Sequence, residues 1–231
     1  NVGEIAAILE ADELERPKEI AELKGNGIEL HQVEFSYGEK TGEVLHGINL
    51  SIQPGTVNAL VGPSGSGKST LINLIPRFYD VTSGEILIDG ENIKNVSLHD
   101  LREKIGFVPQ KGMLFSGTIE SNLKYGGEHI SDEYMHKAAE IAQATEFISS
   151  KESGFNTEIS QGGTNVSGGQ KQRLSIARAL VRKSEIYIFD DSFSALDFKT
   201  DAILRKALKK ETKDAIVLIV AQRIGSIMDA D

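Results

Sequence analysis

The sequence predicts an α/β fold in which a mostly parallel sheet is covered by helices on both faces. Short, mostly apolar runs at residues 57–61, 186–189 and 216–220 have the length and composition of strands that are buried on both faces. Helical patterns lie between these runs, and strands that alternate with helices along a chain form parallel sheets. A chain of 231 residues is long enough for one sizeable core, or for one core with a small subdomain.

Residues 1–24 predict a short helix and a linker that precede the main fold. Apolar residues recur at helical spacing in residues 2–14, and Arg16 and Pro17 are typical of a linker. From Ile28 the pattern changes to strands, because apolar residues then recur with a period near two. Besides the three buried runs, the expected strands cover residues 28–37, 48–52, 85–89 and 105–108.

The middle of the chain differs, because residues 111–165 lack strong strand signals. Residues 131–145 have a helical pattern, with Ser131 as the expected N-cap. Further helices are expected at residues 167–181 and 199–210. We therefore expect a mostly helical insertion between the strands of the sheet.

Composition excludes several classes of function. The net charge of −9 argues against a nucleic-acid-binding surface, which is usually basic. The absence of cysteine excludes thiol catalysis and cysteine-ligated zinc. The longest apolar run, residues 215–221, is much shorter than the roughly 20 residues of a membrane span, so we expect a chain that does not cross a bilayer.

A glycine-rich loop matches the GxxxxGK[ST] pattern in full and lies between a buried strand and a helix. Its glycines let backbone N–H groups point at a phosphate, and the helix N-terminus adds positive potential. Lys68 is expected to reach the β- and γ-phosphates of ATP, and Ser69 to bind Mg²⁺. The alternative is a chance glycine-rich turn. The predicted ATP-binding residues are Gly62, Pro63, Ser64, Gly65, Ser66, Gly67, Lys68, Ser69 and Thr70.

Two carboxylates, Asp190 and Asp191, directly follow the apolar strand at residues 186–189. In P-loop ATPases the first such carboxylate holds Mg²⁺, so Asp190 is the expected ligand. Asp191 lies where a general base or a residue that positions water would lie. Alone, the pair could be an acidic strand end that starts a loop. Together with the glycine-rich loop, it predicts a Mg·ATP site.

A second glycine motif resembles the LSGGQ signature of ABC ATPases, and the KQRLSIARAL stretch after it is typical of that family. The resemblance implies a P-loop NTPase (RecA-like) core, an N-terminal antiparallel β subdomain and an inserted helical subdomain at about residues 111–182. Residues 28–231 then form the ATPase domain, and residues 1–24 the lead helix and linker from a transmembrane domain upstream. The signature residues are Val166, Ser167, Gly168, Gly169 and Gln170.

The resemblance also implies roles for residues that their own pattern does not reveal. Tyr37 matches the aromatic residue that stacks on adenine, although its own sequence context alone predicts a core or cross-strand tyrosine. Gln110 matches the glutamine that contacts Mg²⁺ and senses the transmembrane domain. Residues 115–123 resemble the exporter subtype. In the family the signature completes an ATP site on a partner domain, and the loop that crosses to that site corresponds to Ser194, Ala195, Leu196 and Asp197.

The chain departs from the family pattern at the two expected catalytic residues and in residues 159–163, which replace a VGERG-like stretch. Asp191 stands where the family usually has glutamate, and Gln222 where it usually has histidine. The aspartate carboxylate is pulled back by about 1 Å, and a misplacement of that size can cost on the order of 100-fold in rate. Gln222 can donate a hydrogen bond but cannot carry charge as imidazole can. We therefore expect intact ATP binding and weak hydrolysis.

These departures leave several functions open. We expect the degenerate subunit of a heterodimeric exporter at the cytoplasmic face of the cell membrane, with a non-identical second ATPase domain that carries the consensus glutamate and histidine. A homodimeric exporter with a slow site is an alternative, as is a regulatory ATP-binding module without useful hydrolysis. The acidic charge and the exporter-like segment disfavour a DNA-repair ABC ATPase, so no nucleic-acid partner is expected.

Overall fold

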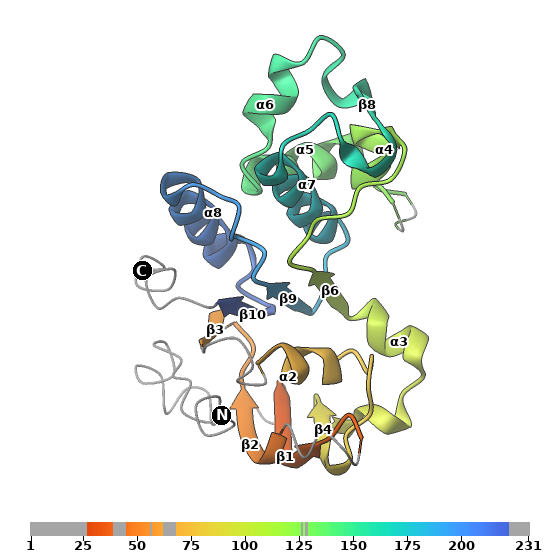
Figure 1. The fold of residues 1–231 in the computed structure, drawn as a ribbon, viewed down its shortest axis with the longest axis vertical. Coiled ribbons are helices and arrows are strands. Elements are labelled where there is room, and N and C mark those ends of the chain that lie inside the picture. Colours follow the sequence, from red (N-terminus) through yellow and green to blue (C-terminus); the bar gives the residue numbers. More distant parts are fainter. Residues whose placement is uncertain are drawn as a thin grey trace.

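A four-stranded parallel sheet lies at the centre of the molecule (Figure 1). Its strand order is β3 (Val57–Val61), β10 (Ile216–Ala221), β9 (Ile186–Asp190) and β6 (Ile105–Val108). The sheet confirms the prediction made from the apolar runs. The computed structural model describes residues 27–38, 45–55, 57–61, 68–125, 127 and 129–221, so the predicted lead helix lies outside the described residues.

The central strands are buried on both faces because successive residues enter two different hydrophobic cores. In β9, Ile186 and Ile188 pack in one core, whereas Tyr187 and Phe189 pack in the other. The same alternation continues in β10, whose six residues are all buried. Because side chains point to opposite faces of a strand in turn, a continuous apolar run is the pattern that fits this position.

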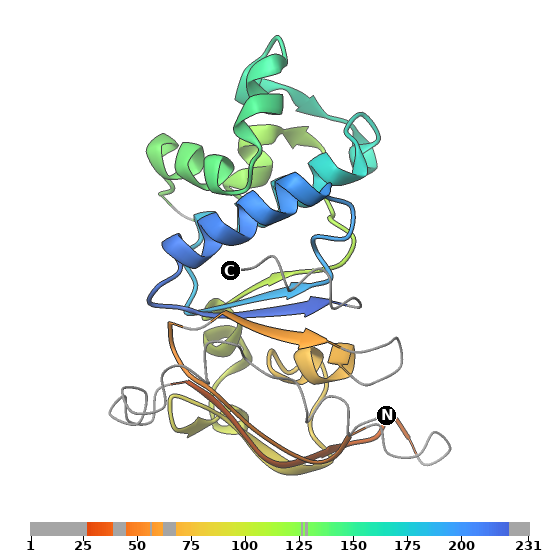
Figure 2. The same ribbon diagram turned by 90° about the vertical axis from the view of Figure 1, so that its left-hand side faces the viewer.

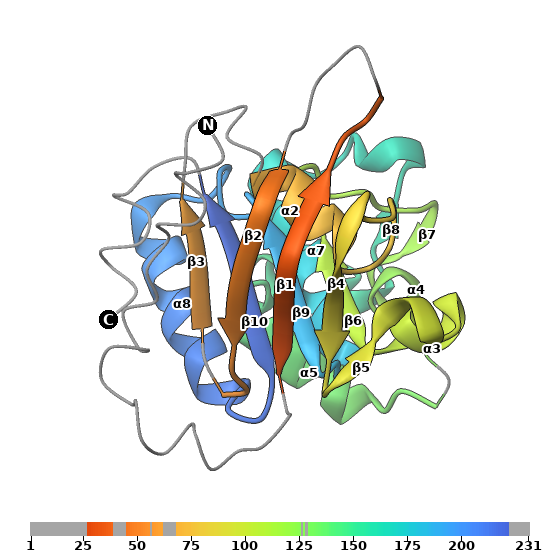
Figure 3. The same cartoon turned by 90° about the horizontal axis from the view of Figure 1, so that it is seen from below.

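The first core lies between the parallel sheet and a second, antiparallel sheet. The antiparallel sheet has the strand order β2 (Leu45–Ile52), β1 (Ile28–Phe35), β4 (Ser83–Ile88) and β5 (Glu91–Asn92). The short helix α2 (Lys68–Leu74) lies between the two sheets (Figure 2). Seen from below, the antiparallel strands cover this face of the molecule (Figure 3). This sheet is the expected N-terminal antiparallel subdomain.

Helices cover the other face of the parallel sheet and form the second core. Helix α8 (Phe198–Glu211) and helix α7 (Gly168–Val181) both contribute to this core. Helix α3 (Leu98–Glu103) lies beside β6, preceded by the 3-10 turn η3 (Ile93–Asn95). None of the helices among the described residues combines the length and the apolar character needed to cross a membrane.

The region that the sequence predicts as a helical insertion lies above α8 in Figure 1. It contains α4 (Ile119–Leu123), α5 (Asp132–Ile141), α6 (Thr145–Ser150) and the 3-10 turns η4 (Gly154–Asn156) and η5 (Gln161–Gly163). It also contains a small antiparallel pair, β7 (Gly117–Thr118) with β8 (Glu158–Ile159). The sequence does not predict this pair, because two residues are too few to show a strand pattern.

The single helix expected at residues 131–145 is two helices in the structure. Ser131 is the N-cap of α5, as predicted, but α5 ends at Ile141. Gln143 has a φ of 60°, in the left-handed region, and the Ala144 N–H donates to Ala139 O at 2.8 Å. This bond spans one residue more than a helical bond, so it closes α5 as in a Schellman motif before α6 begins.

Candidate functional site

The predicted site segments converge on one edge of the parallel sheet. Asp190 ends β9, and Gln110 follows β6 by two residues. The glycine-rich loop follows β3, and Gln222 follows β10; residues 62–67 and Gln222 themselves lie outside the described residues. All four strands are parallel, so their carboxyl ends share this edge, where open α/β sheets bind ligands.

Lys68 and the two aspartates form the charged centre of this edge. Lys68 begins α2 and is only 4% exposed. Burial raises the pKa of Asp190 above its ordinary value, the neighbouring Asp191 adds to the rise, and Lys68 opposes it. The carboxylates of Asp190 and Asp191 and the side-chain amide of Gln110 offer the oxygen ligands that Mg²⁺ prefers. A divalent cation would also relieve the repulsion between the two carboxylates. These residues therefore fit the expected metal ion.

Gln110 and Asp191 meet across the site. The Gln110 side-chain amide donates to Asp191 Oδ2 at 3.2 Å, although the residues are 81 positions apart. Asp191 has a φ of 50°, and its N–H donates to the Val220 carbonyl at 2.9 Å. Aspartate is one of the few residue types that adopt this left-handed backbone readily. The carboxylate is thus held at a turn, next to the glutamine predicted to contact Mg²⁺ and to sense the transmembrane domain.

Tyr37 lies beside the start of α2. Its hydroxyl is 3.1 Å from Thr70 Oγ1, and Thr70 is buried two residues after Lys68. The ring is nearly perpendicular to the rings of Phe35 and Tyr79, with centroid distances of 4.7 and 5.3 Å. Half of Tyr37 remains exposed, so the ring is held by these contacts and still accessible. The side chain of Ser69 is not among those that the structure describes.

The signature residues form the exposed N-terminus of α7. Ser167 is the N-cap: its hydroxyl accepts from the Gln170 N–H, while Gln170 Oε1 accepts from the Ser167 N–H, both at 3.1 Å. This capping box uses two polar groups of the motif internally. Val166 is buried beneath it, whereas Gly168 is exposed and a Cβ there would meet nothing within 4 Å. Exposed helix N–H groups of this kind suit an anion from a second molecule.

The loop of Ser194, Ala195, Leu196 and Asp197 connects the aspartate pair to α8. The Ser194 N–H donates to Asp191 O at 3.4 Å, and Asp197 is the N-cap of α8, accepting from the Thr200 N–H at 2.7 Å. Gly169 of the signature lies against this loop, since a Cβ there would be 3.1 Å from Ala195 O. The signature and this loop therefore form one group of contacts, which the bond from Ser194 to Asp191 connects to a second group, made of Tyr37, Thr70, Lys68, Asp190, Asp191 and Gln110.

Gln172, which the sequence analysis did not single out, joins these two groups. It is buried in α7 and bonded to the backbone of both Gln110 and Ala195. The signal that could have found it is helical spacing, because Gln172 lies one turn before the buried Ile176. A polar residue on a buried helix face needs hydrogen-bond partners, so its position alone points to a structural or functional contact.

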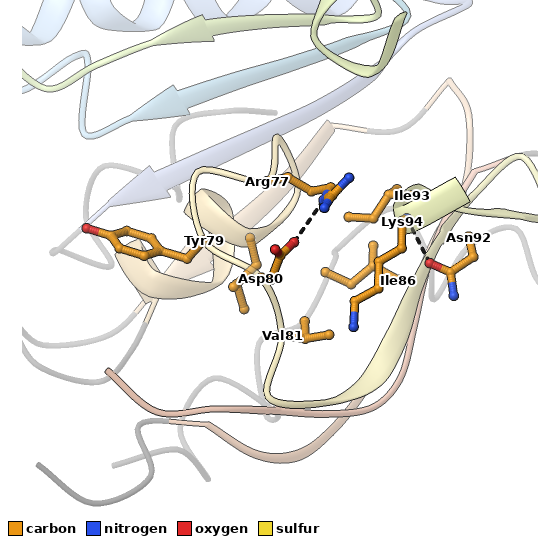
Figure 4. Close-up of a pocket in the computed structure, with 9 residues that line it drawn as sticks. Arg77, Tyr79, Asp80, Val81, Ile86, Asn92, Ile93 and Lys94 are labelled. Atoms are coloured by element: carbon orange, nitrogen blue, oxygen red, sulfur yellow. Dashed lines mark hydrogen bonds and ion pairs between the residues drawn. The ribbon is translucent and has the colours of Figure 1, made fainter. Parts of the chain in front are cut away.

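A small hollow beyond the C-terminal end of α2 is not part of the candidate site. Figure 4 shows that Arg77 and Asp80 face each other there, and Arg77 Nε donates to Asp80 Oδ1 at 2.8 Å. This bond lowers the pKa of Asp80 below its ordinary value. The hollow has room for about one water molecule, which is far too little for a nucleotide.

Three comparisons relate this arrangement to known proteins. The ABC transporter family model matches residues 45–194. Putative multidrug export ATP-binding/permease proteins of two Staphylococcus aureus strains are 47% and 48% identical over 210 residues, which cover 91% of this chain. The structure of a bacterial Atm1-family ABC exporter with ATP bound is similar with a TM-score of 0.84 and 37% identity, over 89% of this chain. The chain spans 36% of the length of each of these proteins.

Proposed function

Because the chain belongs to the ABC transporter family, we propose that it is the ATP-binding domain of an exporter whose own ATP site hydrolyses slowly. The main support is the contact between Gln110 and Asp191 beside the buried Lys68 and the half-buried Asp190, at the edge where the parallel strands end. An export role is supported by the relatives, whose names describe multidrug export.

In this proposal the chain binds ATP through residues on both sides of α2. Lys68 and the backbone of residues 62–67 bind the β- and γ-phosphates, and the exposed ring of Tyr37 stacks on the adenine. Ser69, Gln110 and Asp190 would hold Mg²⁺, and the ion would supply positive charge beside the phosphate oxygens. Lys68 is buried, and a cation kept from water interacts more strongly with phosphate than an exposed cation does.

Asp191 and Gln222 determine the rate at which the γ-phosphate is attacked. Asp191 positions the attacking water and accepts its proton, while Gln222 donates a hydrogen bond to the γ-phosphate. The aspartate reaches less far than a glutamate, and its carboxylate is held back by Gln110. The rate falls accordingly, whereas ATP binding depends on Lys68 and the glycine-rich loop and is kept.

We also propose that the site is one half of an asymmetric dimer. The signature at residues 166–170 and the loop at residues 194–197 complete an ATP site on a non-identical ATPase domain that carries glutamate and histidine at the two catalytic positions. In return, the partner's signature closes this chain's slow site. Supporting this, the exposed α7 N-terminus offers N–H groups to an anion outside the chain. A transmembrane domain upstream would place both domains at the cytoplasmic face of the membrane.

The test is steady-state Mg·ATP hydrolysis by this chain beside its Asp191→Glu/Gln222→His variant. We expect the variant to hydrolyse on the order of 100-fold faster, because the carboxylate regains about 1 Å of reach. Both proteins should bind ATP with similar affinity by equilibrium titration, and Lys68→Ala should weaken that binding in both. The affinity measurement separates a slow site from an empty one.

Equal rates for parent and variant would mean that Asp191 and Gln222 are adequate, which favours a homodimeric exporter with a working site. Binding without hydrolysis in either protein, also after addition of a consensus partner domain, would instead favour a regulatory module. Failure of Lys68→Ala to weaken binding would reject the proposed ATP site.

A further inference from the structure

We propose that Gln172 is a positioning residue that couples the loop of Gln110 to the loop of residues 194–197. The proposal rests on the proposed function, in which Gln110 serves this chain's ATP site and residues 194–197 serve the partner's. Through Gln172, occupancy of one site of the dimer is transmitted to the loop that faces the other site.

The hydrogen bonds of Gln172 carry the proposal. Its Nε2 donates to the backbone carbonyl of Gln110 at 2.8 Å and to Ser194 Oγ at 3.4 Å. Its Oε1 accepts from the Ala195 N–H at 3.1 Å. Both polar atoms of one side chain are thus used, Nε2 on both loops and Oε1 on residues 194–197, and Gln172 is only 5% exposed. A buried bond of this kind is not readily replaced by water, so the two loops are held at a fixed spacing.

Close backbone approaches on both sides of α7 make this coupling short. A Cβ at Gly112, two residues after Gln110, would lie 2.9 Å from Lys171 O and 2.6 Å from Ser175 Oγ. A Cβ at Gly169 would lie 3.1 Å from Ala195 O. Both loops therefore lie directly on the helix that carries Gln172. A displacement of either loop must move α7 or break a bond to Gln172.

The chemistry at this position requires an amide. Gln172 donates and accepts at once, and a primary amide is the side chain of this length that can do both. A carboxylate at pH 7 only accepts, so it would face the Gln110 carbonyl without a proton to share. An apolar side chain of similar size would leave the Gln110 carbonyl and the Ala195 N–H buried without these partners.

The coupling also reaches the reacting end of the site. Gln172 fixes the backbone of Gln110, and the side chain of Gln110 meets Asp191. On the other side, the Ser194 backbone N–H donates to the Asp191 carbonyl. Asp191 is therefore approached by both loops that Gln172 joins, which is why a change at Gln172 should affect turnover more than ATP affinity.

Hydrogen–deuterium exchange of the parent, Gln172→Leu and Gln172→Glu tests the coupling, with and without Mg·ATP. The matched control is Asn122→Leu, because Asn122 is also buried and, among the described residues, its amide bonds to Phe115 and Thr118, far in sequence from residues 194–197. Without nucleotide, we expect the Ala195 amide to exchange about fivefold faster in Gln172→Leu and unchanged in Asn122→Leu. With Mg·ATP, residues 108–112 and 194–197 should both slow in the parent, but only residues 108–112 in Gln172→Leu.

The Gln172→Glu variant supplies a second readout, the pH dependence of exchange, which a general loss of stability would not reproduce. On acidification the introduced carboxyl gains a proton and can again donate to Gln110 O. Slowing of residues 194–197 by Mg·ATP should then return in Gln172→Glu, and should stay absent in Gln172→Leu at every pH. In the Asp191→Glu/Gln222→His background, Gln172→Leu should lower kcat about tenfold with KM changed less than twofold.

Unchanged Ala195 exchange in both Gln172 variants would overturn the proposal, as would an equal change in Asn122→Leu. A failure of the proposed function is detected separately, because Mg·ATP would then leave the exchange of residues 68–74 in the parent unchanged. The exchange of Ala195 without nucleotide would still test the coupling.

Discussion

At the scale of single residues, Tyr37 shows how a binding surface can be fixed without being buried. Its hydroxyl contacts Thr70, and its ring packs against Phe35 and Tyr79, yet half of Tyr37 stays exposed. A ring that is already oriented loses little conformational entropy when a base stacks on it. The hydroxyl bond and the ring can be separated by mutation.

We expect Tyr37→Phe to change ATP affinity less than about threefold, and Tyr37→Ala to weaken it roughly tenfold or more, because stacking of a base on an aromatic ring is worth about 1–3 kcal/mol. Fluorescence titration with an ATP analogue measures both. Tyr79→Leu is the matched control, since Tyr79 contacts Tyr37 but would not itself stack on the base. Equal affinity for Tyr37→Phe and Tyr37→Ala would remove Tyr37 from the base site.

The site residues were predictable to different degrees. Lys68, Asp190 and the glycines follow from a local pattern whose chemistry is readable in sequence. Tyr37 and Gln110 needed the family resemblance, because one tyrosine or glutamine after a strand has no distinctive pattern. Gln172 was missed since its partners are backbone atoms of residues 62 and 23 positions away. Helical spacing can place Gln172 on the buried face of its helix, but it does not identify these distant partners.

At the scale of elements, the break between α5 and α6 shows where helical patterns mislead. Helix ends are usually recognised by glycine or proline, and residues 131–145 contain neither. Here Gln143 takes the left-handed position, and Ala144 closes the turn. The tertiary packing of buried residues in α5 and α6 stabilises the break, so sequence periodicity alone extends the helix too far.

Asp197 is both the N-cap of α8 and a residue of the loop predicted to cross to the partner site, and two substitutions separate these roles. Asp197→Asn keeps a good N-cap and should leave Tm nearly unchanged, whereas Asp197→Ala should lower it by about 2–4 °C. Thermal unfolding of the nucleotide-free chain measures both. A drop of equal size in the asparagine variant would mean that the charge, and not the cap, stabilises α8.

The same cap has a defined pH dependence. The Thr200 backbone N–H bond lowers the pKa of Asp197 below 3.8 in the folded chain. The folded state therefore binds this proton less readily than the unfolded state, and stability from the cap is present above pH 3.8 and lost as pH falls through the folded pKa. The asparagine variant lacks this contribution to acid sensitivity, so its Tm should fall less on acidification than that of the parent.

At the scale of the whole molecule, two cores share one sheet. The parallel strands give alternate side chains to each core, and the functional edge lies where those strands end. This architecture was predictable because it depends on long apolar runs and on their alternation with helices. The β7–β8 pair was not predictable, because each strand has only two residues and the two strands lie about 40 residues apart in the sequence.

The head-to-tail arrangement predicts complementation between two defective chains. Chain one is the parent, with an intact signature and a slow site. Chain two carries Asp191→Glu and Gln222→His together with Gly168→Asp, which adds a negative charge to the signature at a position where a side chain fits. The mixture should hydrolyse at least about tenfold faster than the mean of the separate chains. In the mixed dimer, the intact signature of chain one completes the ATP site of chain two, which carries the restored catalytic residues. Strictly additive rates would contradict the shared sites.

The place of β10 has a consequence for how this protein is made. β10 is residues 216–221, yet it lies between β3 and β9. During translation the antiparallel sheet, with strands between residues 28 and 92, can pair early, whereas the parallel sheet stays divided until residue 221 has left the ribosome. Until then β3 and β9 expose strand edges that other chains can pair with. Ribosome stalling shortly before residue 216 would therefore produce nascent chains that depend on chaperones to avoid aggregation.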